Sequence, residues 1–274
     1  MKAVVAVRDS NAVAELRRRG LDVAPAATLD QAAALCKEHE PQVVIIDEGL
    51  PYAHELVITV KAEVDGPDRD RLPVVLLEGT PDEKVGVRCV PDLSLPAAAL
   101  GDVVDKVKAI VMRRARQRRL FDQEVVLRIA TAPDNVERAG DVFDRLISLC
   151  GYTEEEQVRL GHTFREALGN AAEHGNKNDP GRTIHVNYLR SGDRMSVVVT
   201  DEGKGFDTKA FLARAEEVSA LEHTRSRRTN EARPGGLGVF IMKQTCDGIR
   251  FNDAGNSIYL MKFLPGHAPP AGVS

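Results

Sequence analysis

The sequence lacks the features that mark membrane, secreted and nucleic-acid-binding proteins. Its 274 residues contain no apolar run of about 18, the length that a membrane-spanning helix needs. The N-terminal stretch MKAVVAVRDS turns polar too early for the apolar region of a signal peptide. The formal net charge is only −4 at pH 7, so no large field of one sign favours nucleic acid or a membrane surface. We therefore expect a cytoplasmic protein with neither of these as a direct partner.

Cysteine is scarce as well. The chain has four cysteines, which lie far apart and form no Cys-x-x-Cys pair, and no histidine ligand pattern accompanies them. This spacing favours neither a zinc site nor a disulfide framework. We expect all four to be reduced and mostly buried, as small apolar residues: Cys36, Cys89, Cys150 and Cys246.

Internal repeats and low-complexity segments are also missing from the sequence. A chain of this length can hold two domains, each with its own core. One basic cluster stands out near the middle, and we interpret it as the solvated face of a helical linker over residues 112–121. Its members are Arg113, Arg114, Arg116, Arg118 and Arg119.

Residues 1–111 alternate short β-branched runs with helical stretches. The order KAVVAV, NAVAELRRRG, LDVAP, LDQAAALCKEHE and QVVIID reads as strand, helix, strand, helix and strand. The pattern continues with a helix over 53–64, the strand LPVVLLE, a turn or short helix near Asp82, the strand VRCVP and a final helix from about Ala97. Five such units predict an α/β, flavodoxin-like domain whose parallel sheet is covered on both faces.

From residue 122 the pattern changes to that of an α+β domain, which we place at 122–265. Helices are expected over about 134–149 and 154–173. The strand QEVVLRIA precedes them, and the strands TIHVNYLR, RMSVVVTD, GIRFND and SIYLMKF follow, with a helix after Gly238. Ser-Gly-Asp and Ala-Gly-Asn turns would join the two hairpins. Helices would therefore cover one face of a mixed sheet, and the tail 266–274 is expected to be disordered.

Three polar residues recur at helical spacing in the segment FREALGNAAEHGNKN. Glu166, Asn170 and His174 lie at i, i+4 and i+8, so one helix face would present all three beside an apolar border. A carboxylate, an amide oxygen and an imidazole at such an edge suit proton abstraction and Mg²⁺ coordination. Taken alone, the triplet fits a capping or packing role equally well.

A glycine-rich segment, TDEGKGFD at 200–207, directly follows the strand MSVVVT. Gly203 and Gly205 would let the backbone approach a ligand closely, and Asp201 could accept a hydrogen bond from an exocyclic amine. Such an arrangement suits an adenine ring. By itself, the segment is more typical of a turn after a strand.

The segment PGGLG at 234–238 is a glycine loop that opens a helix. Its backbone N–H groups and the positive end of the helix would form an anion site of the kind that phosphates need. The loop lacks the Lys and Ser/Thr of a P-loop, and a lone glycine loop is weak evidence for any function.

The order of the three segments is more specific than any one of them. A helix with Glu-x-x-x-Asn-x-x-x-His, a strand ending in Asp-x-Gly-x-Gly-Phe-Asp, a polar stretch and Gly-Gly-x-Gly entering a helix together resemble the N, G1 and G2 boxes of the GHKL ATPases. The phrases EALGNAAEHGN and GGLGVFIM resemble the anti-sigma-factor serine kinases of that superfamily, over about residues 122–265. The resemblance implies an α+β sandwich of the Bergerat type that binds ATP and Mg²⁺.

The resemblance also assigns roles to the matching positions. Glu166 would be the general base toward a protein serine, Asn170 would hold Mg²⁺, and His174 would contact substrate at the nucleotide site or simply pack. The polar stretch 208–233 would be the ATP lid, in which Arg225, Arg227 and Arg228 could neutralise phosphate charge. The remaining contacts to the nucleotide would come from Asp201, Gly203, Gly205, Phe206, Arg228, Gly235, Gly236, Leu237 and Gly238.

The first domain resembles the receiver domains of response regulators. Asp47 ends the strand QVVIID, where a receiver carries its phosphorylated aspartate. The other switch residues are missing: the first strand ends in Arg8-Asp9 and not in an acidic pair, and the expected Ser/Thr and Lys positions read Glu78 and Leu95. We therefore interpret the domain as a degenerate receiver that serves dimerisation or docking through its fourth and fifth helices.

Three functions remain open. The first is an ATP-dependent protein serine/threonine kinase that phosphorylates a STAS-type antagonist and otherwise sequesters a sigma factor, which makes it a partner switch. The second is a module that binds ATP without catalysis, against which the intact Glu166 argues. The third is a response regulator whose ATPase output domain is controlled by phosphorylation of Asp47. A homodimer is expected.

Overall fold

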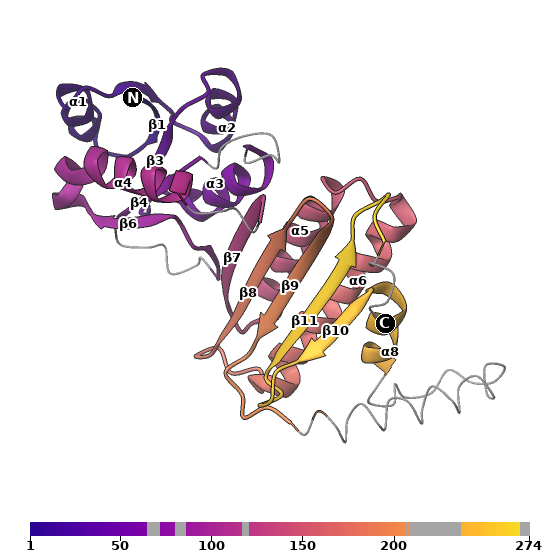
Figure 1. Ribbon diagram of the computed structural model, residues 1–274. Coiled ribbons are helices and arrows are strands. Elements are labelled where there is room, and N and C mark those ends of the chain that lie inside the picture. Colours follow the sequence, from indigo (N-terminus) through magenta and orange to yellow (C-terminus); the bar gives the residue numbers. More distant parts are fainter. Residues whose placement is uncertain (65–71, 80–85, 117–120, 207, 209–236, 269–274) are drawn as a thin grey trace, which may run out of the picture. The chain divides into compact units, whose positions relative to one another are not determined.

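Two compact units make up the chain, Met1–Leu127 and Arg128–Ser274. The computed structural model describes residues 1–64, 72–79, 86–116, 121–206, 208 and 237–268 (Figure 1). The expected turn near Asp82 and most of the expected tail lie outside these ranges. The domain boundaries at 111 and 122 stay predictions.

Five parallel strands form the sheet of the first unit: β1 (Lys2–Ala6), β2 (Asp22–Pro25), β3 (Val43–Asp47), β4 (Val74–Glu78) and β6 (Leu93–Pro96). Their spatial order is β2-β1-β3-β4-β6, the order of flavodoxin-like, doubly wound sheets. The strands β1, β3 and β4 are almost entirely buried, which explains why they read as continuous apolar runs.

The fifth strand of this sheet is β6, and not the predicted segment VRCVP. The strand β5 (Val87–Cys89) exists, but it does not belong to this sheet. β6 pairs with β4 from Leu93 to Pro96. Its sequence LSLP alternates apolar and polar residues and ends in proline, so it lacks the signature of a central strand. An edge strand needs only one buried face, which Leu95 supplies.

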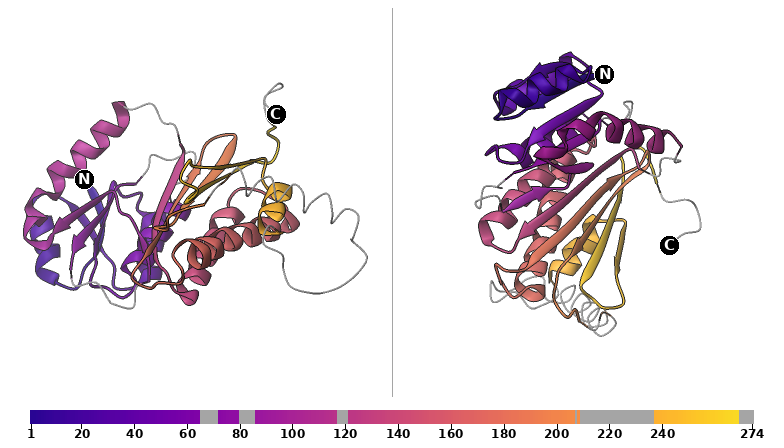
Figure 2. Two further views of the ribbon diagram at one scale, coloured as in Figure 1. Left: turned by 90° about the horizontal axis from the view of Figure 1, so that it is seen from below. Right: turned by 90° about the vertical axis from the view of Figure 1, so that its left-hand side faces the viewer.

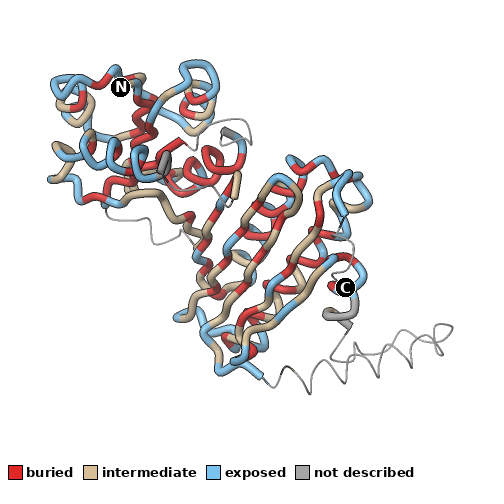
Figure 3. The backbone as a smooth tube through the Cα atoms, in the orientation of Figure 1, coloured by how far each residue is buried: buried red, intermediate tan, exposed pale blue. Residues whose placement is uncertain are grey.

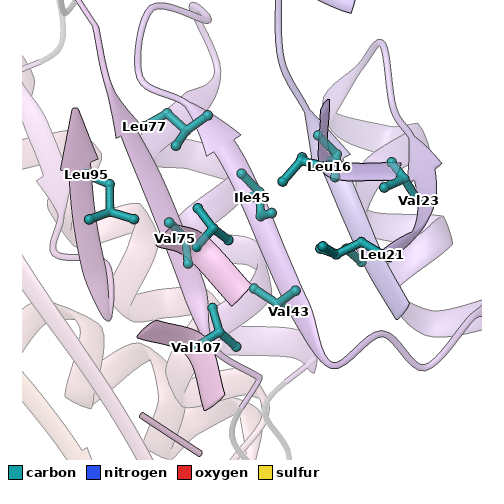
Figure 4. Packing of buried hydrophobic residues seen from close by; sticks show 12 residues of the cluster. Leu16, Leu21, Val23, Val43, Ile45, Val75, Leu77, Leu95 and Val107 are labelled. Atoms are coloured by element: carbon teal, nitrogen blue, oxygen red, sulfur yellow. The ribbon is translucent and has the colours of Figure 1, made fainter. Parts of the chain in front are cut away.

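The helical elements of the first unit are α1 (Ser10–Arg18), α2 (Leu29–Glu38), α3 (Ala53–Thr59) with the π-helical turn η1 (Val60–Val64), and the 3-10 turn η2 (Ala97–Asp102) with α4 (Val103–Arg116). They agree with the predicted helices apart from the π-helical end of the helix predicted over 53–64 and the 3-10 start of the last one. Leu16 of α1 and Val107 of α4 belong to one apolar cluster with Ile45, Val75 and Leu95 of the sheet (Figure 4). Each such buried side chain contributes about 1.5–3 kcal/mol to folding.

Antiparallel pairing joins four strands of the second unit: β8 (Thr183–Arg190), β9 (Arg194–Thr200), β10 (Gly248–Phe251) and β11 (Ser257–Phe263). They neighbour one another in the order β10-β11-β9-β8, and β7 (Gln123–Ala130) follows β8. Buried residues alternate with less buried ones along β8 and β9, so one face of the sheet packs against a core (Figure 3). The two predicted hairpins are confirmed.

Three helices lie on one side of this sheet: α5 (Pro133–Ser148), α6 (Glu154–Asn170) and α8 (Leu237–Thr245) (Figures 1 and 2). Phe143 of α5 and Phe164 of α6 are fully buried, with ring centroids 4.9 Å apart. A capping box begins α6, because the side chains of Thr153 and Glu156 each bond the other residue's backbone N–H. α6 ends at Asn170, earlier than predicted, and continues as the π-helical turn η3 (Ala171–Gly175).

The four cysteines are free and buried, as the sequence predicts. Burial raises the pKa of both Cys89 and Cys246 to about 12, so both stay thiols at neutral pH. Among the described residues, no helix combines the length and the apolar character that crossing a membrane requires. The same residues contain no group of three or more His, Cys, Asp or Glu placed to hold a metal ion.

One arginine ties α6 to α5. Arg165 contacts three carboxylates of α5, with nitrogen–oxygen distances of 3.4, 3.0 and 2.8 Å to Glu137, Asp141 and Asp144. The side-chain hydrogen bond with Asp144 raises the pKa of Arg165 above its usual value. Gly140 makes room for the guanidinium, since a Cβ there would lie 2.7 Å from Nε of Arg165. The helix that carries the candidate site is thus fixed on its neighbour.

We expect Arg165→Ala to lower the free energy of unfolding by about 1 kcal/mol, because three exposed carboxylates lose a shared partner that is itself only partly exposed. Arg159→Ala removes an exposed pair with Glu155 on the same helix and should cost less than about 0.5 kcal/mol. Urea unfolding at low and high salt measures both values. Equal effects of the two substitutions, or an Arg165→Ala effect that salt does not reduce, would show that the network contributes nothing specific.

Candidate functional site

The predicted polar face of α6 lies at the edge of the core. Glu166 and Asn170 are partly buried near the end of α6, among the buried residues Phe164 and Leu168. A π-helix takes more residues per turn than an α-helix, so beyond Asn170 the i+4 spacing no longer describes one face. His174 lies in this turn and is exposed. Glu166 and Asn170 therefore form the inner part of the site, and His174 lies at its solvent edge.

Gly238, in the first turn of α8, lies against Glu166. A Cβ on Gly238 would overlap the Glu166 carboxylate, so a larger residue would force one of them to shift. Leu237 begins α8 directly before it. The first turn of a helix carries unpaired N–H groups and partial positive charge. The carboxylate of Glu166 and the anion-attracting end of α8 therefore belong to one site.

Asp201 follows β9 and lies against the end of η3. A Cβ on Gly175 would overlap the Asp201 carboxylate, which shows how closely the two segments approach. The backbone N–H of Gly203 donates a hydrogen bond of 2.7 Å to Oδ1 of Asp201. Within the described part of the chain, the second carboxylate oxygen of Asp201, Oδ2, accepts no hydrogen bond from another residue. Asp201 thus keeps one acceptor oxygen for a ligand.

Partial burial changes the acidity of this carboxylate. Desolvation raises the pKa of Asp201, and the hydrogen bond from Gly203 opposes that shift only in part. A carboxylate that is withdrawn from water and lacks a full set of donors gains more from a ligand's N–H group than an exposed one does. The amine-binding role that the sequence predicts for Asp201 stays a prediction.

Gly205 and Phe206 contact the β10–β11 hairpin. Gly205 adopts a φ of +72°, and a Cβ there would overlap the carbonyl oxygen of Ala254. Phe206 packs edge-to-face on Phe251, with ring centroids 5.5 Å apart. These two predicted nucleotide-site residues therefore also hold the glycine-rich segment against the hairpin, a structural role that the sequence pattern did not reveal.

Asn176 is a site residue that sequence reasoning missed. Its side chain is fully buried: Oδ1 accepts a 2.8 Å hydrogen bond from the backbone N–H of Glu202, and Nδ2 donates one of 2.8 Å to Oγ1 of Thr131. Both partners are distant in sequence, so no local spacing connects them to Asn176. The available signal is the Gly-Asn pair at the end of the helical segment, which by itself indicates only a helix end.

Several predicted site residues lie outside the described part of the chain. They include the predicted lid, of which only Thr208 is described. Their predicted roles at the phosphates stay predictions: Arg225, Arg227, Arg228, Gly235 and Gly236.

In the first unit, the Arg8 guanidinium forms an ion pair with the Asp47 carboxylate. Its Nε donates to Oδ2 of Asp47 at 2.8 Å, and its Nη2 donates to Oδ1 at 2.9 Å. The backbone N–H of Gly49 also donates to Oδ1, at 2.9 Å. Burial alone would raise the pKa of Asp47, but these hydrogen bonds hold it below its usual value. Both carboxylate oxygens already have donors, and a neighbouring cation balances the charge.

Comparison with known proteins assigns the second unit. The family model described as a histidine kinase-like ATPase domain matches residues 129–262. The serine-protein kinase RsbW of Bacillus subtilis (strain 168) is 27% identical over 143 residues, which cover 52% of this chain and 86% of that protein. RsbW of Halalkalibacterium halodurans is 30% identical over 115 residues, which cover 42% of this chain and 67% of that protein.

A solved structure gives a weaker alignment. NtrX from Brucella abortus in complex with ATP aligns with a TM-score of 0.33 and 12% identity, over 61% of this chain and 40% of that chain. An alignment at this level supports no conclusion about fold or function.

The residues matched by the family model include those whose close contacts define the candidate site. Glu166, Asp201 and Gly238 all lie within 129–262. The relatives extend the agreement beyond these positions to most of their own length. The chain therefore belongs to the GHKL family of histidine kinase-like ATPases and kinases, which includes the serine-protein kinase RsbW.

Proposed function

We propose that the protein is an ATP- and Mg²⁺-dependent protein serine/threonine kinase of the anti-sigma type in a partner-switching pathway. The supporting observation is that the continuous helical segment α6–η3 contacts both of the other candidate segments. Glu166, in the second half of α6, lies against Gly238 of α8, and Gly175, at the end of η3, lies against Asp201. The segment thus connects a candidate general base, an anion-attracting helix end and an acceptor for an amino group.

These groups suit ATP chemically. Oδ2 of Asp201 would accept a hydrogen bond from the adenine amino group, and the first turn of α8 would face the phosphates. The amide oxygen of Asn170 would hold Mg²⁺, which prefers oxygen ligands. ATP supplies the phosphoryl group that is transferred. Glu166 would accept the proton of the attacking serine hydroxyl.

The partner classes rest on the relatives. The aligned proteins are named serine-protein kinases, which supports a protein hydroxyl as the phosphoryl acceptor. In this proposal the acceptor is a STAS-type antagonist, the sequestered partner is a sigma factor, and the kinase acts as a homodimer. The alternative hypothesis is a module that binds ATP without transferring phosphate. It requires the same binding site but assigns no catalytic role to Glu166.

Substitutions in α6 distinguish the kinase hypothesis from the non-catalytic one. Glu166→Gln should leave ATP affinity within about threefold of the wild type but lower phosphate transfer to a STAS protein roughly 100-fold, because it removes a general base while keeping the shape. Asn170→Ala should abolish the Mg²⁺ dependence of ATP binding. Calorimetry of the full-length protein and a transfer assay in the same samples measure both.

Asn187→Ala, an exposed substitution on β8, is the control and should change neither quantity. Transfer by Glu166→Gln at the wild-type rate would refute the assigned base. ATP binding by the wild type without transfer to any STAS protein would favour the non-catalytic module.

Asp201→Asn should weaken ATP binding about 10-fold, because an amide has one acceptor oxygen for two donors, the N–H of Gly203 and the adenine amine. The same change should raise the thermal midpoint of the nucleotide-free protein near pH 7. Since the folded pKa of Asp201 is raised, stability is lost as the pH rises from the unfolded value through the folded one, and the amide avoids that loss. The midpoint difference should vanish well below pH 4, roughly the unfolded pKa.

Nucleotide titrations and melting curves across pH provide the test. Asp253→Asn, which neutralises an exposed carboxylate of the hairpin turn, is the matched control. If Asp201→Asn bound ATP as tightly as the wild type does, Asp201 would not be the adenine acceptor.

In this proposal the first unit is a degenerate receiver-like domain used for docking or dimerisation. The observation that favours it over a phosphorylated response regulator is the contact between Arg8 and Asp47. The guanidinium already satisfies both carboxylate oxygens, where a receiver would need Mg²⁺ and an incoming phosphoryl group. Because the pKa of Asp47 is held low, the pair persists at neutral pH and is lost only as the pH falls through that lowered pKa.

We therefore expect the full-length protein to take up no label at Asp47 from radiolabelled acetyl phosphate and Mg²⁺ at neutral pH. The reason is that Arg8 blocks the oxygens and no acidic pair is present to bring in the metal ion. Labelling that the wild type shows and Asp47→Asn loses would instead establish the response-regulator reading.

A further inference from the structure

A single buried amide joins two segments of the candidate site. Asn176 follows η3 and has no exposed surface, so its amide could not remain unpaired without a large cost. Oδ1 of Asn176 accepts from the backbone N–H of Glu202, and Nδ2 donates to Oγ1 of Thr131. The amide therefore bonds one segment through its oxygen and another through its nitrogen.

The nitrogen side provides a fixed anchor. Oγ1 of Thr131, which receives the Nδ2 hydrogen bond, itself donates to the backbone carbonyl of Arg182 at 2.8 Å. The backbone N–H of Asn176 bonds the carbonyl of Ala171 at 2.8 Å, which closes the π-helical turn. With both its backbone and its nitrogen held, the amide of Asn176 has one orientation.

The oxygen side reaches the segment that carries Asp201. Glu202 is the next residue in the chain, so the hydrogen bond from its N–H to Asn176 fixes the peptide that follows Asp201. On the other side, the backbone N–H of Asp201 donates to the carbonyl of Asn256, and Nδ2 of Asn256 donates to the carbonyl of Asp201, both at 3.0 Å. The backbone of Asp201 is held from two directions, and Asn176 is the contact from the helix side.

We infer that Asn176 is a positioning residue for adenine recognition: its amide sets the place of the Asp201 carboxylate and so determines how well the site distinguishes adenine from a purine without the 6-amino group. This inference rests on the proposed ATP binding. Removing the amide oxygen frees the N–H of Glu202 and lets the Asp201 segment shift. A charge-assisted hydrogen bond weakens steeply when its geometry is lost, whereas contacts to phosphate and Mg²⁺ at α8 and Asn170 do not depend on this link.

The test compares two nucleotides on the full-length protein. ATP and purine riboside triphosphate, which lacks the 6-amino group, are titrated with Mg²⁺ present. The wild type should bind ATP about 10-fold more tightly, as expected for an amine that donates to a carboxylate. Asn176→Ala should lower this ratio to about twofold and change the affinity for purine riboside triphosphate less than about threefold, because only the amine contact depends on the amide.

Two further variants separate positioning from general stability. Thr131→Val removes the hydrogen bond on the nitrogen side but leaves Glu202 bonded to Asn176 and the backbone N–H of Asn176 bonded to Ala171, so it should lower the melting temperature and reduce the ATP preference less than Asn176→Ala does. Asn187→Ala, on the exposed face of β8, should change neither. If Asn176→Ala does not give a folded protein by circular dichroism, Asn176→Ser, which is too short to reach Glu202, takes its place with the same expected ratio.

An unchanged ATP preference in the Asn176 variant would overturn the inference. An equal loss of preference in Thr131→Val would also overturn it, because the effect would then be a general loosening. Equal affinity of the wild type for both nucleotides would also overturn the inference, because the adenine amino group would then make no contact that Asn176 could position. A wild type that binds neither would refute the proposed function itself.

Discussion

The candidate site depends on how closely the end of η3 approaches the segment after β9. Gly175 has no room for a side chain because the Asp201 carboxylate occupies that space, and Asn176 holds the contact through the N–H of Glu202. This close packing buries part of Asp201 and raises its pKa. The carboxylate is therefore already desolvated when the protein folds, before any ligand binds. A hydrogen-bond donor of a ligand would then bind an acceptor that is fixed in place and partly shielded from water.

The same helical segment sets the geometry of the rest of the site. α6 is held on α5 by Arg165 and by the buried ring of Phe164, and it places Glu166 against Gly238 of α8. Because the packed segment α6–η3 contacts both α8 and the Asp201 carboxylate, it fixes how Glu166, the first turn of α8 and Asp201 are placed relative to one another. Phosphoryl transfer relies mainly on such positioning together with electrostatic stabilisation, and less on the reactivity of protein groups.

Local sequence patterns predict much of this architecture and fail where the cause is not local. Continuous apolar runs predicted the buried parallel strands, and helical spacing predicted the shared face of Glu166 and Asn170. The fifth strand was misplaced because LSLP, an edge strand, lacks such a run. The end of α6 was misplaced because a π-helical turn interrupts the 3.6-residue period without any signal in composition. Asn176 was missed because its partners, Thr131 and Glu202, are near it only in the folded chain.

Amide hydrogen exchange of the full-length protein, with and without ATP and Mg²⁺, tests most directly whether the three segments form one nucleotide site. If they do, exchange slows together in peptides covering 166–176, 201–206 and 238–245 when the nucleotide is added. Slowing confined to one of these segments, or none at all in the presence of saturating nucleotide, would mean that the segments do not act as a single site.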